Sequence, residues 1–368
     1  MIDQRQEGAT PAAVSAQRAA HPLRDALRAR AYRALVPLRA TIELTKRCNL
    51  RCHHCYVVEG GNEVPTARWL ALLDELLAEG CWGVTLTGGE FRLRGDWLEV
   101  ARGVKRRRMG LTLLTNGTLF DPDDLEAIVA LRPSRVCVSL YGGDAAAHDS
   151  VTGVEGSFAR SVATLRALRA GGVKCQVSSV LMRDNLSEFP RIIELARRLD
   201  CEFRFEPTVN PRADGSTDVL EHRVVGDELR AFYEHRWVRE DTREWRAASS
   251  REEDHQGTPA ANCAAGFTMV TFEADGCVMP CIGFGPSFGN ILNGSFGSIW
   301  RGEAASRHRE RMRRPLAECS SCALRSMCTV RCPRLAAIED GDVNGKSSRA
   351  CELASMVAGI RESLRSAP

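Results

Sequence analysis

The 368-residue sequence predicts an α/β fold, a partial (β/α)6 barrel of the TIM type followed by a small cysteine-rich domain. Two observations lead to this prediction. Between residues 41 and 206, six runs with the alternation of β-strands are separated by helical patterns, which is typical of parallel strands joined by helical crossovers. The chain also has fifteen cysteines, which gather after the first strand run and in the last third of the sequence.

Strands and helices alternate without interruption through this region. Strands are expected at 41–45, 82–87, 111–115, 135–140, 174–181 and 202–206. Helices are expected between them, at 67–79, 96–108, 122–130, 158–170 and 186–198. A barrel of parallel strands carries its chemistry at the carboxyl ends of the strands. The residues that follow each strand run are therefore the first candidates for a functional site.

Four regions are expected along the chain. They are a basic helical arm (1–38), the barrel (39–207), a linker with a bridging helix over 227–237 (208–260) and the cysteine-rich domain (261–368). The first dozen residues of the arm are expected to be disordered. Apolar side chains at helical spacing could line one face of the rest of the arm: Leu23, Leu27, Tyr32 and Leu35. The arm either caps the barrel or docks an acidic partner.

Composition and charge exclude several classes of protein. The chain is 44% hydrophobic and 26% charged, with a formal net charge of +3, which is too small to indicate nucleic-acid binding. The sequence has neither an apolar run long enough for a membrane span nor the apolar segment of a signal peptide, so we expect no membrane and a cytoplasmic location. Cysteines in such a protein more often bind metal than form disulfides.

Three cysteines follow the first strand with the spacing C-x3-C-x2-C: Cys48, Cys52 and Cys55. Three thiolates on one tight loop can bind three irons of a [4Fe-4S] cluster and leave the fourth iron without a protein ligand. An open iron suits the binding and reduction of a small molecule better than plain electron storage. A zinc site is the alternative, but zinc loops usually pair one C-x2-C with a second, and none lies nearby. The spacing favours the cluster.

Short polar motifs follow the next three strands. They are Gly88, Gly89 and Glu90 after the second strand, Thr115 and Asn116 at the end of the third, and Ser139 near the end of the fourth. Paired glycines let the backbone approach a ligand closely. Each motif alone is more often a turn, but their order at successive strand ends indicates one binding site.

Together with His54, the aromatic residue before the last cysteine of the loop, these motifs resemble the radical S-adenosylmethionine (SAM) enzymes. The resemblance implies that the open iron chelates the amino and carboxylate groups of SAM. An electron from the cluster then cleaves SAM to a 5′-deoxyadenosyl radical, which abstracts hydrogen from the substrate. It also implies that the G-G-E backbone and Glu90 contact the SAM amino group, and that Thr115, Asn116 and Ser139 lie around its methionyl or ribose part.

Side-chain alternation assigns further residues to the barrel interior. Glu43 on the first strand, Tyr141 after the fourth and Glu206 on the sixth are candidates to contact the substrate during catalysis. Tyr141 stands where many radical SAM enzymes have Asp. Cys137 and Arg204 lie on the same faces of their strands. The alternative is that Glu43, Arg204 and Glu206 form a structural ion network.

The last hundred residues carry a second set of cysteines. Their order is Cys263, Cys277, Cys281, Cys319, Cys322, Cys328, Cys332 and Cys351. A zinc ribbon would need four thiols, and this larger number fits two clusters better. The order and gaps resemble the SPASM domain, a C-terminal extension of radical SAM enzymes that binds two auxiliary [4Fe-4S] clusters.

The SPASM resemblance implies a ligand set for each auxiliary cluster. The outer cluster would be held by Cys319, Cys322, Cys328 and Cys351. The inner cluster would be held by Cys263, Cys281 and Cys332. Relatives with a fully ligated inner cluster have another cysteine a few residues after the first, and residues 264–270 contain none. Either Cys277 is the fourth ligand, or one inner iron is open and could bind substrate.

The resemblance also implies a class of substrate. SPASM-bearing enzymes mostly modify peptides and proteins, so we expect a radical SAM oxidoreductase or peptide maturase that crosslinks a ribosomally made natural-product precursor after hydrogen abstraction. Ile282 stands where formylglycine-forming relatives have Asp, which disfavours that reaction. With 38 residues before the first strand, a leader peptide would need a separate leader-binding protein, or would bind the barrel and the basic helix 301–314. A flavodoxin- or ferredoxin-type protein is the expected reductant.

Three other functions are alternatives. One is a radical SAM enzyme that acts on a tetrapyrrole (haem precursor) or another small molecule. A second is a peptide epimerase, in which Cys137 or another barrel thiol returns a hydrogen atom from the opposite face. The third is an iron–sulfur electron carrier without enzymatic activity, which would make no 5′-deoxyadenosine from SAM.

Overall fold

The computed structural model of the chain describes residues 22–235, 238, 263–283, 285–314, 317–324, 328 and 332–365. The first part of the predicted arm, with its expected disorder, lies outside the described residues, as does most of 236–262 in the predicted linker. No helix among the described residues is long and apolar enough to cross a membrane.

Six parallel strands form the wall of a partial barrel, and the fold class predicted from the sequence is confirmed. They are β1 (Arg39–Glu43), β2 (Gly83–Thr87), β3 (Gly110–Thr115), β4 (Arg135–Ser139), β5 (Cys175–Val180) and β6 (Glu202–Glu206). Each strand pairs in parallel with the next along the chain, for example through Ile42 and Leu86. The carboxyl ends of all six strands therefore open on one side of the sheet.

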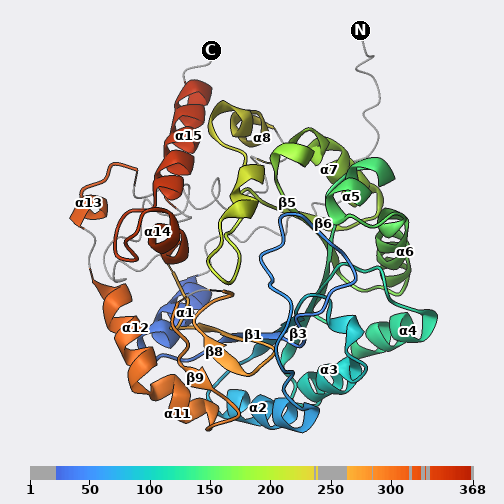
Figure 1. The fold of residues 1–368 in the computed structure, drawn as a ribbon, viewed down its shortest axis with the longest axis vertical. Coiled ribbons are helices and arrows are strands. Elements are labelled where there is room, and N and C mark those ends of the chain that lie inside the picture. Colours follow the sequence, from blue (N-terminus) through green and yellow to red (C-terminus); the bar gives the residue numbers. More distant parts are fainter. Residues whose placement is uncertain are drawn as a thin grey trace.

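Helices surround the outside of the strands (Figure 1). The crossovers contain α2 (Thr66–Ala78), η1 (Phe91–Leu93), α3 (Trp97–Arg106), α4 (Pro122–Leu131), α5 (Ala145–Thr152), α6 (Ser157–Ala170), η2 (Arg183–Glu188) and α7 (Phe189–Arg198). The short helix α5 was not predicted. It is capped by Asp144, whose side chain accepts a hydrogen bond from the backbone N–H of Ala147.

A continuous apolar core lies between the strands and these helices. Ile42 and Leu44 of the first strand and its exit are fully buried there, against Trp69 and Leu72 of α2 among others. Each such side chain contributes about 1.5–3 kcal/mol through burial. Because side chains alternate, Glu43 points to the other face of the sheet, into the barrel, as the sequence predicted.

The sheet continues into the C-terminal part of the chain. Strand β7 (Met269–Phe272) pairs in parallel with β1, with Phe272 opposite Ile42. Strands β8 (Cys277–Met279) and β9 (Gly289–Asn290) then add in antiparallel fashion. The order is β6-β5-β4-β3-β2-β1-β7-β8-β9. The predicted cysteine-rich domain is thus attached to the edge of the barrel that carries the cysteine loop, residues 48–55.

Further helices complete the C-terminal half of the chain (Figure 1). After β6 come η3 (Asp218–His222), η4 (Gly226–Leu229) and α8 (Arg230–Glu234), which lie within and just before the helix predicted for the linker. After β9 come α11 (Phe296–Arg301), α12 (Glu303–Arg313), α13 (Ala317–Ser320), α14 (Pro333–Glu339) and α15 (Ser348–Arg365).

The arm contributes one helix, α1 (Pro22–Arg33). Its Tyr32 stacks on Phe267 at 4.4 Å between ring centroids. Leu23 and Leu27 are 64% and 50% exposed, so the predicted apolar face is wrong for these two residues. The aromatic contact of Tyr32, near the carboxyl end of the helix, packs it beside β7.

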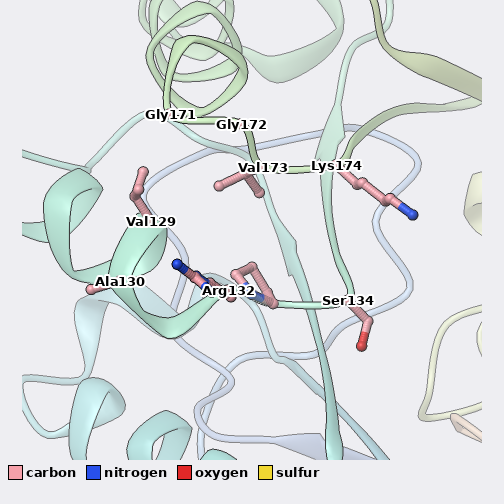
Figure 2. Close-up of a pocket in the computed structure, with 9 residues that line it drawn as sticks. Val129, Ala130, Arg132, Ser134, Gly171, Gly172, Val173 and Lys174 are labelled. Atoms are coloured by element: carbon pink, nitrogen blue, oxygen red, sulfur yellow. The ribbon is translucent and has the colours of Figure 1, made fainter.

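A pocket opens at the amino-terminal ends of β4 and β5, away from the cysteine loop (Figure 2). Its lining comes from the end of α4 and the two turns that lead into these strands: Val129, Ala130, Arg132, Pro133, Ser134, Gly171, Gly172, Val173 and Lys174. Barrel enzymes place their chemistry at the opposite face, so this pocket is not the candidate active site.

Candidate active site

The cysteine loop follows β1 at the carboxyl end of the barrel, and hydrogen bonds from other loops fix its backbone. Arg51 N–H donates to the carbonyl of Thr152 at 2.8 Å. The Arg212 guanidinium donates to the carbonyl of Cys55 at 3.0 Å. Within the loop, Cys55 N–H donates to the carbonyl of Cys52 at 3.1 Å. The positions of the three thiols are therefore set by protein contacts on both sides of the loop.

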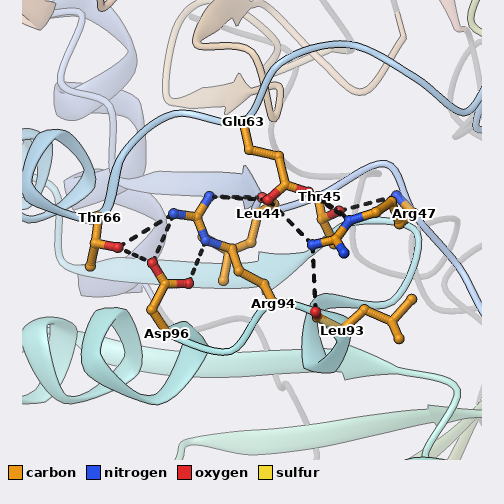
Figure 3. A network of polar contacts seen from close by, with 8 residues as sticks. All are labelled: Leu44, Thr45, Arg47, Glu63, Thr66, Leu93, Arg94 and Asp96. Atoms are coloured by element: carbon orange, nitrogen blue, oxygen red, sulfur yellow. Dashed lines mark hydrogen bonds and ion pairs between the residues drawn. The ribbon is translucent and has the colours of Figure 1, made fainter.

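A polar network braces the exit from β1, directly before the cysteines (Figure 3). The buried Arg94 guanidinium donates to the carbonyl of Leu44 at 3.2 Å and pairs with Asp96 at 2.6 Å. Arg47 pairs with Glu63 at 3.0 Å, and Glu63 also accepts a hydrogen bond from Thr45. These contacts tie residues 44–47 to the segment before α2, through Glu63, and to the loop after β2, through Arg94.

Gly88 and Gly89 pack against the same stretch. A Cβ added to Gly88, whose φ is +151°, would lie 2.3 Å from the carbonyl oxygen of Thr45, and one on Gly89 would lie 2.3 Å from that of Arg47. The N–H groups of Gly89 and Glu90 donate to these two carbonyls at 2.8 Å. The glycines thus allow close contact between two backbones, a reason for them that the sequence prediction did not include.

Glu90 links the end of β2 to the end of β3. Its carboxylate is 1% exposed and accepts hydrogen bonds from the Thr115 hydroxyl at 2.9 Å and from the Asn116 N–H at 2.7 Å. Burial raises the pKa of Glu90 to about 7, although these hydrogen bonds oppose the rise. In the structure this carboxylate therefore orders the predicted SAM-binding motifs relative to one another.

Asn116 connects the β3 motif to the cysteine loop. Its side-chain N–H₂ donates to Asn49 Oδ1 at 2.9 Å and lies 3.9 Å from the Sγ of Cys48. The backbone N–H of Leu50 also points at this sulfur, at 3.4 Å. Two N–H groups aimed at one sulfur suit a thiolate ligand, whose negative charge they stabilise.

His54 and Tyr141 form an aromatic wall beside the loop. Their rings meet edge to face at 4.7 Å, and Tyr141 stacks on His148 at 5.8 Å. The Tyr141 N–H donates to His148 Nδ1 at 3.1 Å, and the Tyr141 hydroxyl bonds the Ser139 side chain. His54 Nδ1 is buried and has no hydrogen-bond partner among the described residues. The predicted residues His54, Ser139 and Tyr141 are thus neighbours.

The three loop thiols fit an iron–sulfur cluster. Burial, followed by the charges of Cys55 and Cys48, raises the pKa of Cys52 to about 12. Burial likewise raises the pKa of Cys48 and Cys55. Three half-buried thiols whose ionisation is this costly need a cationic centre to become thiolates, and together they offer three of the four ligands of a [4Fe-4S] cluster.

Glu43 lies on the β7 side of the loop. It is buried, and the hydroxyl of Tyr56 donates to its carboxylate at 3.0 Å. Burial raises the pKa of Glu43 to about 7, and Glu273 adds to the rise. No ion pair joins Glu43 to Arg204 among the described residues, so the alternative ion network is not formed at this carboxylate.

Two other interior candidates lie away from Glu43. Glu206 is half-buried at the end of β6, the strand farthest from β1 in the row of six. Cys137 is buried on β4, where burial raises its pKa to about 11 and the nearby charges belong to Arg135, Arg204 and Glu202. The structure therefore does not bring Glu43, Glu206 and Cys137 into one group.

The C-terminal cysteines fall into two groups. Burial raises the pKa of Cys281 to about 12, and the charges of Cys263 and Cys332 add to the rise, so these three thiols are neighbours. The charges of Cys319 and Cys322 similarly raise the pKa of Cys351. The first group contains the three thiols predicted for the inner cluster, and the second contains three of the four predicted for the outer cluster. The backbone N–H of Cys328 donates to the carbonyl of Leu324 at 2.9 Å.

Cys277 stands apart from the inner group. It lies on β8, where Asn290 Nδ2 is 3.7 Å from its sulfur and its N–H donates to Asp275 at 3.0 Å. After burial, the charges that raise its pKa are those of Asp275 and Glu273, not of another cysteine. Of the two alternatives left by the sequence, this arrangement favours an inner site with three thiols.

Arg334 joins the two sides of the site. Its guanidinium donates to the carbonyls of Ile282 and Arg212 at 3.3 and 3.2 Å. Its charge lowers the pKa of both Tyr56 and Cys281, against the larger effect of burial. A run of polar groups, Glu43, Tyr56 and Arg334, therefore extends from the cysteine loop toward the inner thiols. The sequence analysis did not identify Tyr56 or Arg334, because neither belongs to a motif.

Three thiols at the carboxyl end of a partial parallel barrel, with two further thiol groups beside it, define an iron–sulfur enzyme. Residues 42–196 match the model of the radical SAM superfamily, and residues 263–323 match the SPASM iron-sulfur cluster-binding domain. The chain belongs to the radical SAM superfamily. Its cofactors are therefore SAM, a [4Fe-4S] cluster and auxiliary iron–sulfur clusters.

The chain is similar to several characterised proteins. It is 30% identical over 311 residues to a PqqA peptide cyclase of Rhodopseudomonas palustris, which covers 79% of this chain and 81% of the cyclase. It is 27% identical over 312 residues to an AdoMet-dependent heme synthase of Nitratidesulfovibrio vulgaris, covering 78% of this chain and 84% of the synthase. Its fold matches that of SuiB of Streptococcus suis, solved bound to the precursor peptide SuiA, with a TM-score of 0.72 and 17% identity. The match covers 90% of this chain and 80% of the SuiB chain.

Proposed function

We propose that this radical SAM enzyme modifies a peptide, a ribosomally made natural-product precursor, and forms a crosslink after hydrogen abstraction. The observation that carries the proposal is the similarity to a PqqA peptide cyclase, which extends over four-fifths of both chains. The similar coverage of a heme synthase keeps a haem precursor as the competing substrate. Two further relatives, the subtilosin biosynthesis protein AlbA and the sporulation killing factor maturation protein SkfB of Bacillus subtilis, add support for the peptide.

Cys48, Cys52 and Cys55 are the proposed ligands of the SAM-binding cluster. When bound, this cluster supplies the electron that cleaves SAM and produces the 5′-deoxyadenosyl radical. Around it, we assign SAM binding to residues of four strand ends: His54, Gly88, Gly89, Glu90, Thr115, Asn116 and Ser139. The contacts among Glu90, Thr115, Asn116 and Cys48 support this assignment, because they order these residues next to the proposed iron ligands.

We assign three residues of the barrel interior to contact with the substrate. Crosslinking removes two hydrogen atoms from the peptide. The 5′-deoxyadenosyl radical would take one, and the other would leave as a proton and an electron. The auxiliary clusters would accept the electron, and a group that accepts the proton is needed near the reacting atoms. Glu43 is the proposed acceptor, since it is a buried carboxylate whose one described hydrogen bond comes from Tyr56. Tyr141, which contacts His54, positions the substrate beside SAM, and Glu206 contacts it from the opposite side of the barrel.

The auxiliary thiols are assigned as the SPASM resemblance implies. Cys319, Cys322, Cys328 and Cys351 hold the outer cluster, and Cys263, Cys281 and Cys332 hold the inner one. The inner cluster then has an iron without a cysteine ligand, and Cys277 is not part of the set.

Two protein partners complete the proposal. Reduction of the SAM-binding cluster requires a one-electron donor of low potential, which we assign to a flavodoxin- or ferredoxin-type protein in the cytoplasm. Recognition of the leader part of the precursor is assigned to a separate leader-binding protein.

The test is an anaerobic assay of the reconstituted protein with SAM, a reductant and peptides encoded by short reading frames beside its gene. We expect 5′-deoxyadenosine together with a peptide that has lost two hydrogen atoms in mass. If 5′-deoxyadenosine forms but no peptide changes, while a haem precursor is converted, the peptide proposal is wrong. A deuterium atom gained from solvent without that loss would indicate epimerisation.

A further inference from the structure

Three side chains from separate parts of the chain converge beside the cysteine loop. They are His53 of the loop itself, Asp184 of η2 and His222 of η3. His53 Nε2 lies 3.4 Å from Asp184 Oδ2, and His222 Nδ1 lies 2.8 Å from the same oxygen. One nitrogen or oxygen from each of the three residues lies within 4.8 Å of the other two.

This separation fits coordination of one metal ion. Zinc binds imidazole nitrogen and carboxylate oxygen at about 2.0–2.2 Å, so ligand atoms in a tetrahedral site stand about 3.3 Å apart. The distances from Asp184 Oδ2 to the two imidazole nitrogens, 3.4 and 2.8 Å, lie on either side of that value. Side-chain rotation would bring the two imidazole nitrogens to the same separation from each other. Two imidazoles and one carboxylate are also a common set of protein ligands at zinc sites that keep an open position.

Hydrogen bonding alone does not satisfy the three groups. Asp184 Oδ2 is already paired with His222, and the buried His53 Nε2 has no hydrogen-bond partner among the described residues. The two imidazole rings lie 4.2 Å apart, tilted by 35°. Glu221 adds a second carboxylate 3.7 Å from His222 Nε2. A cation would bind His53 Nε2, whose 3.4 Å contact with Asp184 lacks hydrogen-bond geometry, and would balance the two negative charges.

We propose that His53, Asp184 and His222 bind a divalent transition metal ion of the zinc class, with one coordination position open to water or to an oxygen of the substrate. The site differs from the iron–sulfur sites because its ligands are nitrogen and oxygen. It ties the cysteine loop to the segments after β5 and β6, next to the SAM-binding thiols. It stands whether or not the substrate is a peptide.

The test measures zinc in the protein with its iron–sulfur clusters loaded. After incubation with zinc sulfate and gel filtration, elemental analysis should find about one zinc per chain, and zinc-edge X-ray absorption should find nitrogen and oxygen neighbours at about 2.0–2.2 Å. In His222→Ala and in Asp184→Asn, zinc should fall at least about tenfold, with iron unchanged. Asp227→Asn, which alters a carboxylate that is 96% exposed, should keep the zinc.

Two results would overturn the proposal. One is zinc retained at the wild-type level in both ligand variants. The other is an absorption spectrum dominated by sulfur at about 2.3 Å, which would place the zinc on cysteines. Because Asp184→Asn preserves the shape of the side chain and Asp184 is partly exposed, unchanged iron in this variant separates loss of the ligand from loss of the fold.

Discussion

The two cysteine regions are built in opposite ways. The thiols of the cysteine loop lie within eight residues of one another, and backbone contacts to Thr152 and Arg212 hold the loop. The outer thiols are spread from Cys319 on α13 to Cys351 on α15. In the C-terminal stretch, residues 317–347, Pro333, Leu335 and Ala336 are the buried apolar residues among those described. The barrel makes its site from a packed core, whereas the C-terminal stretch has little core of its own.

The flanks of the C-terminal stretch are well packed. Before it, Phe272, Phe296 and Trp300 belong to the barrel core. After it, Leu353 and Val357 of α15 pack with α8 in a second apolar cluster. A segment with few buried apolar groups and several thiols gains its folding free energy from metal binding. We infer that protein contacts determine the first iron–sulfur site, while metal determines the fold of the C-terminal stretch.

The largest effect is expected from Cys52→Ala. Loss of one of three thiols removes the SAM-binding cluster, so 5′-deoxyadenosine should fall to background and iron by about four of about twelve atoms per chain. The melting curve should change little, because the barrel core does not depend on the cluster. Cys81→Ala is the matched control: this thiol is buried before β2, and its loss should cost about 1 kcal/mol while 5′-deoxyadenosine is still produced.

Removal of all iron tests whether the C-terminal stretch depends on metal for its fold while the barrel does not. Oxidation and chelation should lower hydrogen-exchange protection in residues 317–347 at least about a hundredfold, while the helices α2 to α7 keep theirs. Mass spectrometry of peptic fragments reports both regions in one sample. Equal loss of protection in α2 and in the C-terminal stretch would show that the barrel also needs metal.

Two neighbouring cysteines should respond differently to the same substitution. Cys281→Ala removes a thiol that is close to Cys263 and Cys332, so iron should fall by about four atoms per chain. Cys277→Ala removes a thiol that contacts Asn290 and Asp275, and iron should stay at the wild-type level. Iron and sulfide analysis of both variants decides between them. Loss of iron in Cys277→Ala would make Cys277 the fourth inner ligand.

The barrel was predictable because its signals are local. Alternation and helical periodicity located β6 at Glu202–Glu206 without error and the other strands to within two residues at each end. The pairing of β7 with β1 was not predicted, since it joins residues more than two hundred positions apart and no local pattern reports it. Helix α5 was missed because eight residues give too little periodicity to distinguish a helix from a loop.

The candidate site was predictable where a motif carried it. The cysteine loop and the motifs after β2 and β3 do meet, but the sequence could not show that Gly88 and Gly89 contact the backbone of Thr45 and Arg47. Arg309, included in the predicted basic helix, is buried with its guanidinium 4.3 Å from the Trp300 ring, so it serves packing and not a peptide surface. Such contacts depend on tertiary structure, which composition and spacing do not encode.

The smallest predicted effect concerns Glu90, a buried carboxylate of the barrel site whose hydrogen bonds form without metal. Burial raises its pKa to about 7 from an ordinary value of 4.5, so between these values the folded protein holds a proton that the unfolded chain has released. Raising the pH from 5 to 8 therefore lowers the free energy of unfolding, by at most about 3 kcal/mol from this group. Glu90→Gln cannot titrate and should lose this part of the pH dependence.

The measurement is the thermal midpoint of wild type and Glu90→Gln at pH 5.5 and pH 8, without SAM. The thermal midpoint of Glu90→Gln should rise relative to that of wild type as the pH rises. Glu126→Gln, a change at an exposed carboxylate on α4, should keep the pH dependence of wild type. If Glu90→Gln also keeps it, Glu90 is ionised at little cost in the fold. The ends of β2 and β3 would then be ordered by something other than this buried carboxylate, and protein contacts alone would not explain how the barrel forms its site.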